Sequence, residues 1–83
     1  MAGNRHEHKF HQLVTEARAL LPRVQWEAVQ PRHAIVLRGL EDFLAAPAQM
    51  AAARVLYVHY ALVRPVVHFL LAHMLRRCPL APS

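Results

Sequence analysis

Seven histidines are the residues of this 83-residue chain that are most able to bind a metal ion or carry a proton. Three of them fall in the segment His-Glu-His-Lys-Phe-His at positions 6–11, where His8 and His11 would share a helical face. The segment lacks the His-Glu-x-x-His spacing of a zinc helix, and no carboxylate follows at ligand spacing. We therefore expect a solvated N-terminal turn here and no metal site.

His59 and His73 are fourteen residues apart, so a continuous helix would place them near one face. Facing histidines in a helical bundle can hold haem or, together with carboxylates, a di-metal centre. The last carboxylate of the chain is Asp42, which excludes a di-metal site, and no haem-attachment motif is present. We expect no cofactor and interpret the two histidines as core or interface residues.

Side chains that could carry out catalysis are scarce. Cys78 is the only cysteine, Ser83 is the only serine, and the chain has five acidic residues in total. Gly3 and Gly39 are the only glycines, which are too few for a phosphate-binding loop. A chain of this length also rarely encloses a catalytic pocket. We therefore expect a protein that is not an enzyme and has no small-molecule substrate.

Five residues are candidates for the centre of a protein interface: Trp26, Tyr57, Tyr60 and Arg64, whose types are enriched there, and His68, which continues their row. The last four follow one another at spacings of three and four, so a continuous helix would align them on one face. Aromatic and arginine side chains in one row can anchor a partner protein. We predict that these five residues bind a partner. A partly buried packing face within the chain explains the same spacing equally well.

The hydrophobic fraction supports a protein partner. It is 55%, whereas average globular domains have about 45–50% even when glycine is counted. A chain of this length buries only about 60–65% of its unfolded surface, so part of its apolar surface should face something else. A single cysteine allows no disulfide within the chain. We expect a small accessory or regulatory protein that acts as a homo-oligomer or within a larger assembly.

Residues 55–75 are the one segment that could cross a membrane, which makes a membrane-complex subunit the second hypothesis. The segment is long enough to span a bilayer and is rich in leucine and valine. Arg64 near its centre, three histidines and Pro65 offset that gain, so insertion of this segment alone is close to neutral in free energy. We therefore expect the chain to lie outside the bilayer.

A DNA-binding regulator is the third hypothesis, because the net charge is +5 with neutral histidines. The basic residues are dispersed, however, and only Arg76 and Arg77 are adjacent, whereas nucleic-acid binders usually gather such charge on one stripe. Residues 31–64 could form a helix-turn-helix, but its second helix would be too apolar to lie in a groove. The polar first dozen residues lack an apolar signal region, so we expect an intracellular protein.

The first element is predicted to be a helix over residues 4–21. Asn4 can cap its N-terminus, and Pro22 should end it. The apolar positions form one stripe at helical spacing: Phe10, Leu13, Val14, Ala17, Leu20 and Leu21. An aspartate at position 13 would place a charge on this stripe.

Residues 23–30 alternate apolar and polar side chains, so they could pair with residues 34–37 as a β-hairpin. An isolated hairpin is only marginally stable, and we prefer a short helical turn or an extended connector at 23–30. Pro31 suits the first position of a second helix, which should end near residue 46.

The last element is predicted to run from about Pro47 to about Arg77. Pro65 should kink it or split it in two. We therefore expect an all-α fold of three to four helices, a small bundle with a long C-terminal helix kinked at Pro65. Residues 1–83 should form one domain, with flexible tails at 1–3 and 79–83.

Overall fold

The computed structural model describes residues 2–82, and side chains from residue 5 onward. The described residues form helices and no strands, which confirms the all-α fold predicted from the sequence. The main helices are α1 (Ala2–Leu20), α2 (Pro31–Leu44), α3 (Pro47–His59) and α4 (Val63–His68). A π-helical turn, η3 (Phe69–His73), and the short α5 (Met74–Arg76) continue α4 directly, so these three segments form one C-terminal helix.

The apolar stripe of α1 is the base of the core. Phe10, Leu13, Val14 and Ala17 are each at most 5% exposed. The prediction that Asn4 caps this helix is wrong, because α1 begins at Ala2 and Asn4 lies inside its first turn. Pro22 ends the helix as expected, through the 3₁₀ turn η1 (Leu21–Arg23), because proline cannot supply the next amide hydrogen.

Residues 24–30 connect α1 to α2 and form no hairpin. The 3₁₀ turn η2 (Trp26–Ala28) and short extended stretches make up the connector, as we preferred. Val24 forms an isolated antiparallel bridge with Leu80, so the extended backbone of the connector pairs with the C-terminal tail instead of with the start of α2.

The C-terminal tail is held in place up to residue 81, although we expected residues 79–83 to be flexible. The amide of Gln25 donates to the carbonyl of Pro79 over 2.9 Å, and the amide of Ala81 donates to the carbonyl of Arg23 over 2.7 Å. Leu80 is partly buried against the core. Backbone hydrogen bonds to the connector therefore order the tail; Ser83 lies outside the described residues.

The predicted long helix is interrupted between α3 and α4, and the break in the helix lies at residues 60–62. The sequence predicts the kink or split at Pro65 itself, whereas the interruption lies three to five residues before it. The ring of a proline clashes with the carbonyl four residues earlier, here that of Ala61, so an α-helix cannot continue through that residue. Pro65 itself lies in the first turn of α4, where a missing amide hydrogen costs nothing.

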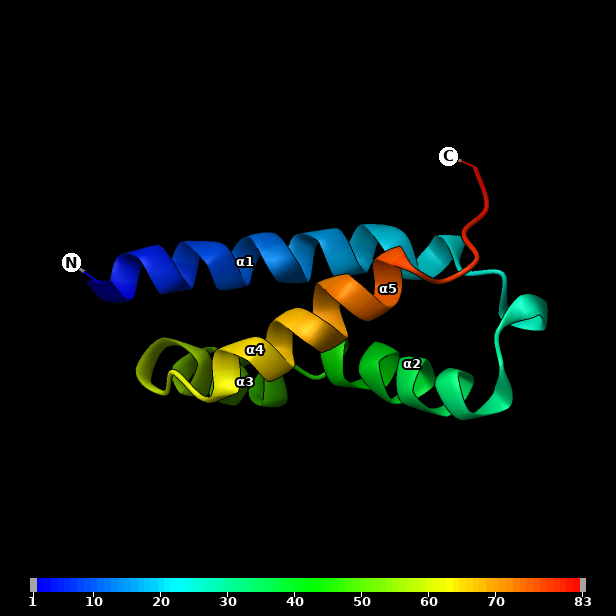
Figure 1. Cartoon of the computed structure of the whole chain (residues 1–83). Helices are drawn as coiled ribbons and strands as arrows, with labels where there is room; N and C mark the ends of the chain where they lie inside the picture. The colour runs from blue at the N-terminus through cyan, green and yellow to red at the C-terminus, as the bar shows by residue number, and fades with distance from the viewer. Residues whose placement is uncertain (1, 83) are drawn as a thin grey trace.

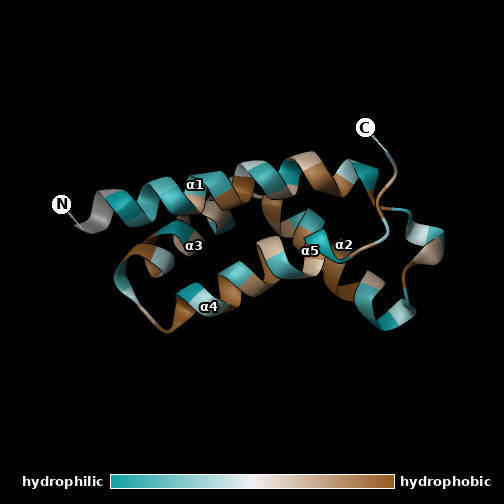
Figure 2. Ribbon diagram, turned by 45° about the horizontal axis from the view of Figure 1, so that its top comes forward, coloured by the Kyte–Doolittle hydropathy of each residue, from teal (hydrophilic) through white to brown (hydrophobic). Residues whose placement is uncertain are grey.

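The helices are arranged around α1, which spans most of the elongated molecule (Figure 1). Helix α3 and the C-terminal helix pack on α1, while α2 joins the bundle mainly through α3. Hydrophobic residues from all of these helices turn inward, and the outer side of α1 is hydrophilic (Figure 2).

The structure also bears on the predicted membrane segment at residues 55–75. It is not one helix, because the break at residues 60–62 interrupts it. Among the described residues, no helix combines the length and the apolar character needed to cross a bilayer.

Candidate interaction site

Three of the five predicted partner-binding residues meet inside the molecule at the corner between α3 and α4. Tyr57 is only 1% exposed, and its hydroxyl lies 2.7 Å from Nε2 of His68. Its ring packs on Phe10 of α1, with ring centres 5.4 Å apart. Tyr57 is therefore a core residue, and its side chain has no free surface for a partner.

Arg64 closes the C-terminal end of α3. Its Nε donates to the carbonyl of Tyr57 over 2.8 Å, and its Nη2 donates to the carbonyl of Val58 over 2.9 Å. The last carbonyls of a helix have no partner within the helix. A cation at this end also interacts favourably with the partial negative charge of the helix dipole. Tyr57, Arg64 and His68 are thus brought together across the turn between α3 and α4. They do not lie along the one continuous helical face that the sequence predicts.

Burial shifts the pKa values of the groups at this corner. It lowers the pKa of His68 from 6.5, with a smaller contribution from the charge of Lys9. It raises the pKa of Tyr57, a shift that the Arg64 charge opposes. The lowered pKa favours a neutral His68, and in the tautomer that carries its proton on Nδ1 the Nε2 atom accepts the hydrogen bond from the Tyr57 hydroxyl.

Trp26 and Tyr60 are placed apart from this corner and from each other. Trp26 is partly buried, and the guanidinium of Arg38 stacks over its ring at 3.6 Å from the centre. Arg38 also pairs with Glu41 over 3.2 Å, and not with Asp42. Tyr60, in the break, is 58% exposed, so it is the member of the predicted set most accessible to a partner.

Large exposed hydrophobic side chains mark other surfaces that sequence reasoning did not identify. Eight such residues are at least 40% exposed: Ile35, Val36, Val55, Leu56, Tyr60, Leu62, Val66 and Phe69. They lie on α2, on the second half of α3, in the break, and on the C-terminal helix. Apolar spacing alone does not separate these residues from the core, and only the packing of the helices shows which apolar residues remain outside it.

An apolar cleft lies between α2 and the C-terminal helix. Its volume is about 260 Å³. The lining side chains are almost entirely apolar, and Gly39 leaves a gap in the α2 wall where an added Cβ would meet nothing within 4 Å. The lining residues are Phe10, Val36, Gly39, Leu40, Phe43, Ala53, Val67, Leu70 and Leu71.

A second hollow of about 560 Å³ extends this cleft towards the start of α2 and the end of the C-terminal helix. The two share Val36 and Leu70, so they form one continuous surface. The cationic or titratable side chains that line the second hollow are His33, His73, Arg77 and Cys78, and no carboxylate lines either hollow. The cleft is thus apolar along its length and basic at one end.

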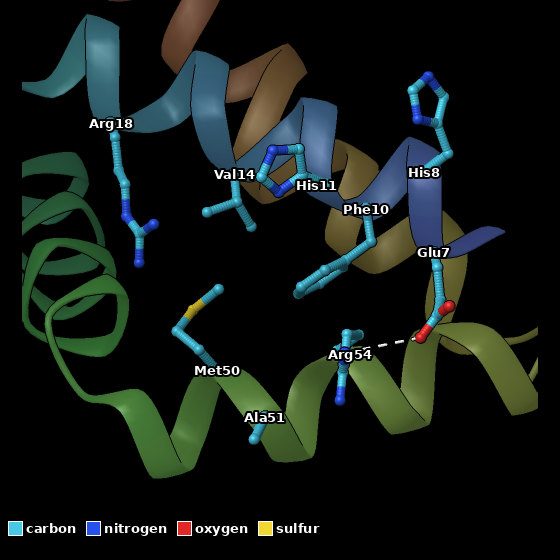
Figure 3. A pocket seen from close by; sticks show the side chains of 9 residues that line it. All are labelled: Glu7, His8, Phe10, His11, Val14, Arg18, Met50, Ala51 and Arg54. Atoms are coloured by element: carbon cyan, nitrogen blue, oxygen red, sulfur yellow. Dashed lines mark ion pairs between the residues drawn. The ribbon is translucent and has the colours of Figure 1, made fainter. Parts of the chain in front are cut away.

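A third hollow, of about 610 Å³, lies between α1 and α3. Phe10, Val14 and Met50 point into it, while His8 points away (Figure 3). Glu7 and Arg54 pair across it at 3.6 Å. Arg18, which also lines it, donates to the carbonyl of Leu44 over 3.0 Å. These three charged groups therefore already have partners within the chain, which makes this hollow a weaker candidate site than the apolar cleft.

No cluster of three or more histidine, cysteine or acidic side chains that could hold a metal lies within the part of the chain that is described. Cys78 is partly buried, which raises the pKa of its thiol, and its Sγ donates to the carbonyl of Met74 over 3.2 Å. A raised pKa disfavours the reactive thiolate. Burial and this hydrogen bond therefore favour the protonated thiol of Cys78, which lines the second hollow.

Comparison with known protein families, curated proteins and solved structures gives no match to this chain.

Proposed function

We propose that this chain is a small, non-catalytic accessory or regulatory protein that acts by binding another protein chain, in an assembly of its own copies or in a larger complex. The observation that supports this proposal is the apolar cleft between α2 and the C-terminal helix. A water-filled apolar cleft is unfavourable, and large apolar surfaces on small chains commonly mark interaction sites. Val36 and Phe69 line this surface and are 40% and 53% exposed.

The size of the exposed surface points the same way. The chain exposes 5639 Å², whereas a compact chain of its 9.5 kDa mass is expected to expose about 5,000 Å². The radius of gyration is 13.1 Å, against about 12 Å expected for this length. A partner chain in the cleft would remove part of this excess surface from water, including the exposed side chains of Val36 and Phe69.

The test compares the full-length wild-type chain with Val36→Asp and Ile35→Asp. Val36 lines the cleft, while its neighbour Ile35 is 74% exposed and lines neither hollow of the cleft. Each tagged protein is purified from the cells that make it, and its molar mass is measured by light scattering. We expect wild type and Ile35→Asp to carry a partner, or to form an oligomer, that Val36→Asp lacks. If all three proteins purify alone and monomeric, the proposed function is wrong.

A further inference from the structure

The proposed function leaves the identity of the partner open, and the following inference rests on it. We infer that the cleft takes an amphipathic α-helix of a different protein, with its apolar stripe in the cleft and acidic residues along the flank that faces Arg77. The argument has three parts: the backbone of the occupant, the close approach at Gly39, and the charges at the basic end.

The lining of the cleft selects a helical occupant. The second hollow is also lined by the connector and the tail, at Val29 and Pro79. The walls of the first hollow are all helices, whose backbone hydrogen-bonding groups are already used within the helices. An extended peptide would bring its own amides and carbonyls into a space with almost no polar atoms, and each unpaired group would cost free energy. A helix satisfies its backbone internally and presents only side chains, which is the usual way an apolar groove between helices is filled.

The shape of the α2 wall favours the same occupant. Val36, Gly39, Leu40 and Phe43 follow each other at helical spacing along the wall. Gly39 lies among them without a side chain, and the space in front of it is open. A ridge of larger side chains on a docked helix can enter at this point and pack between Val36 and Phe43.

The charges argue against a second copy of this chain as the occupant. Three of the five acidic residues, Glu7, Glu16 and Glu41, already pair with arginines of the same chain. A second copy would therefore bring mostly cationic surface to the basic end of the cleft, at a net charge of +5 per chain. An acidic flank on a different protein complements Arg77 there, with His33 and His73 beside it.

The experiment uses labelled probe peptides of about 18 residues, long enough to form a helix once docked. One carries leucines at helical spacing and glutamates on both flanks. A second has lysines in place of the glutamates, and a third has the first sequence with a central proline. Fluorescence anisotropy with the full-length chain measures binding. We expect the acidic peptide to bind roughly tenfold more tightly than the lysine peptide, and the proline peptide not to bind.

Matched variants of the chain place the binding in the cleft. Val36→Asp should weaken binding of the acidic peptide by at least about tenfold, and Ile35→Asp should change the affinity for this peptide by less than about twofold. Arg77→Glu should weaken binding of the acidic peptide and strengthen binding of the lysine peptide, because it reverses the charge at this end of the cleft. The Arg77 side chain is exposed and makes no ion pair with another described residue, so the substitution breaks no such pair within the chain. Circular dichroism of each variant confirms that the fold is kept.

Three outcomes would overturn the inference. They are equal binding of the acidic and lysine peptides, no binding of either, and a dimer of the chain that Val36→Asp dissolves. A fluorescent fatty acid that binds while both peptides fail would assign the cleft to an acyl chain instead. A dimer, or a co-purified protein that Val36→Asp loses although no peptide binds, would leave the proposed function standing and remove only the helical, acidic partner.

Discussion

The corner formed by Tyr57, Arg64 and His68 shows how residues of interface type can serve the interior of their own chain. The Tyr57 hydroxyl forms a hydrogen bond with the His68 imidazole, and the Arg64 guanidinium donates to two carbonyls at the end of α3. In a core with so few polar groups these bonds specify how α4 leaves α3, because a buried polar group without a partner is costly.

Arg64→Ala should destabilise the fold, whereas a purely partner-binding role for Arg64 would leave the fold unchanged. The substitution removes two hydrogen bonds to the end of α3 from a half-buried cation. We expect a loss of about 1–2 kcal/mol in the free energy of unfolding, measured by urea denaturation. Arg64→Lys, which keeps the charge near the carbonyls, should recover part of the loss. An unchanged urea midpoint for Arg64→Ala would show that the two bonds contribute nothing.

His68 should make the stability depend on pH. Its pKa is lowered in the folded chain, so between that pKa and the ordinary value of 6.5 the unfolded chain binds more protons. Stability should therefore fall as the pH drops from about 7.5 to about 5.5. The pKa of His6 is also lowered, mainly by burial, and this shift likewise makes the fold less stable at lower pH.

The measurement is the urea midpoint of unfolding across this pH range for wild type and His68→Gln. Because glutamine does not titrate, the variant should show a shallower loss of stability on acidification. His59→Gln removes an exposed histidine and serves as the control for the loss of any imidazole. Equal pH dependence in wild type and His68→Gln would contradict the role given to His68.

Among the elements, the connector and the tail depend on each other. Neither has enough local hydrogen bonding to form a strand alone, and the pairing of Val24 with Leu80 lets each satisfy the other's backbone. The Arg23 side chain adds a bond from Nε to the carbonyl of Ala81 over 2.9 Å. This contact joins the C-terminal tail to the segment that follows α1 and holds the C-terminal helix against the end of α1.

Removal of residues 79–83 should lower the free energy of unfolding by about 2 kcal/mol, from two backbone hydrogen bonds and the partly buried Leu80. Thermal unfolding followed by circular dichroism measures the loss. Leu80→Ser, which keeps the backbone bonds, should show a smaller effect of the same sign. A truncated chain as stable as wild type would show that the tail only rests on the surface.

The whole molecule is elongated, with extents of 43 × 22 × 21 Å, and one helix ties it together. Helix α1 contributes Phe10, Leu13, Val14 and Ala17 to a core of thirteen buried hydrophobic residues. A chain of this length is expected to be stable by only about 4–12 kcal/mol, so damage to this stripe affects every other helix.

Leu13→Asp tests the dependence on α1. Leu13 is 3% exposed, and an aspartate there would be buried without a partner. We expect the variant to be largely unfolded at neutral pH, with its helical circular dichroism signal and its compact elution volume lost. Gln12→Asp, a substitution at the exposed position just before it, should remain folded. A folded Leu13→Asp protein would mean that the core does not depend on α1.

The sequence by itself determined the helical class, the stripe of α1 and the approximate ends of the helices. These follow from local causes: apolar spacing at the helical period, and prolines at positions 22, 31, 47 and 65 that exclude helix before or around them. It also indicated, through composition alone, more apolar surface than one small core can cover.

Only the tertiary structure decided which apolar and aromatic residues are covered. Tyr57 and Tyr60 have equal claims to an interface in the sequence, yet one is 1% exposed and the other 58%. The difference arises because the helix is interrupted at residues 60–62, so that α4 turns back and lies beside Tyr57. The cleft has the same origin. Val36 and Leu70 are far apart in sequence, and only the packing of α2 and the C-terminal helix places them on one open surface.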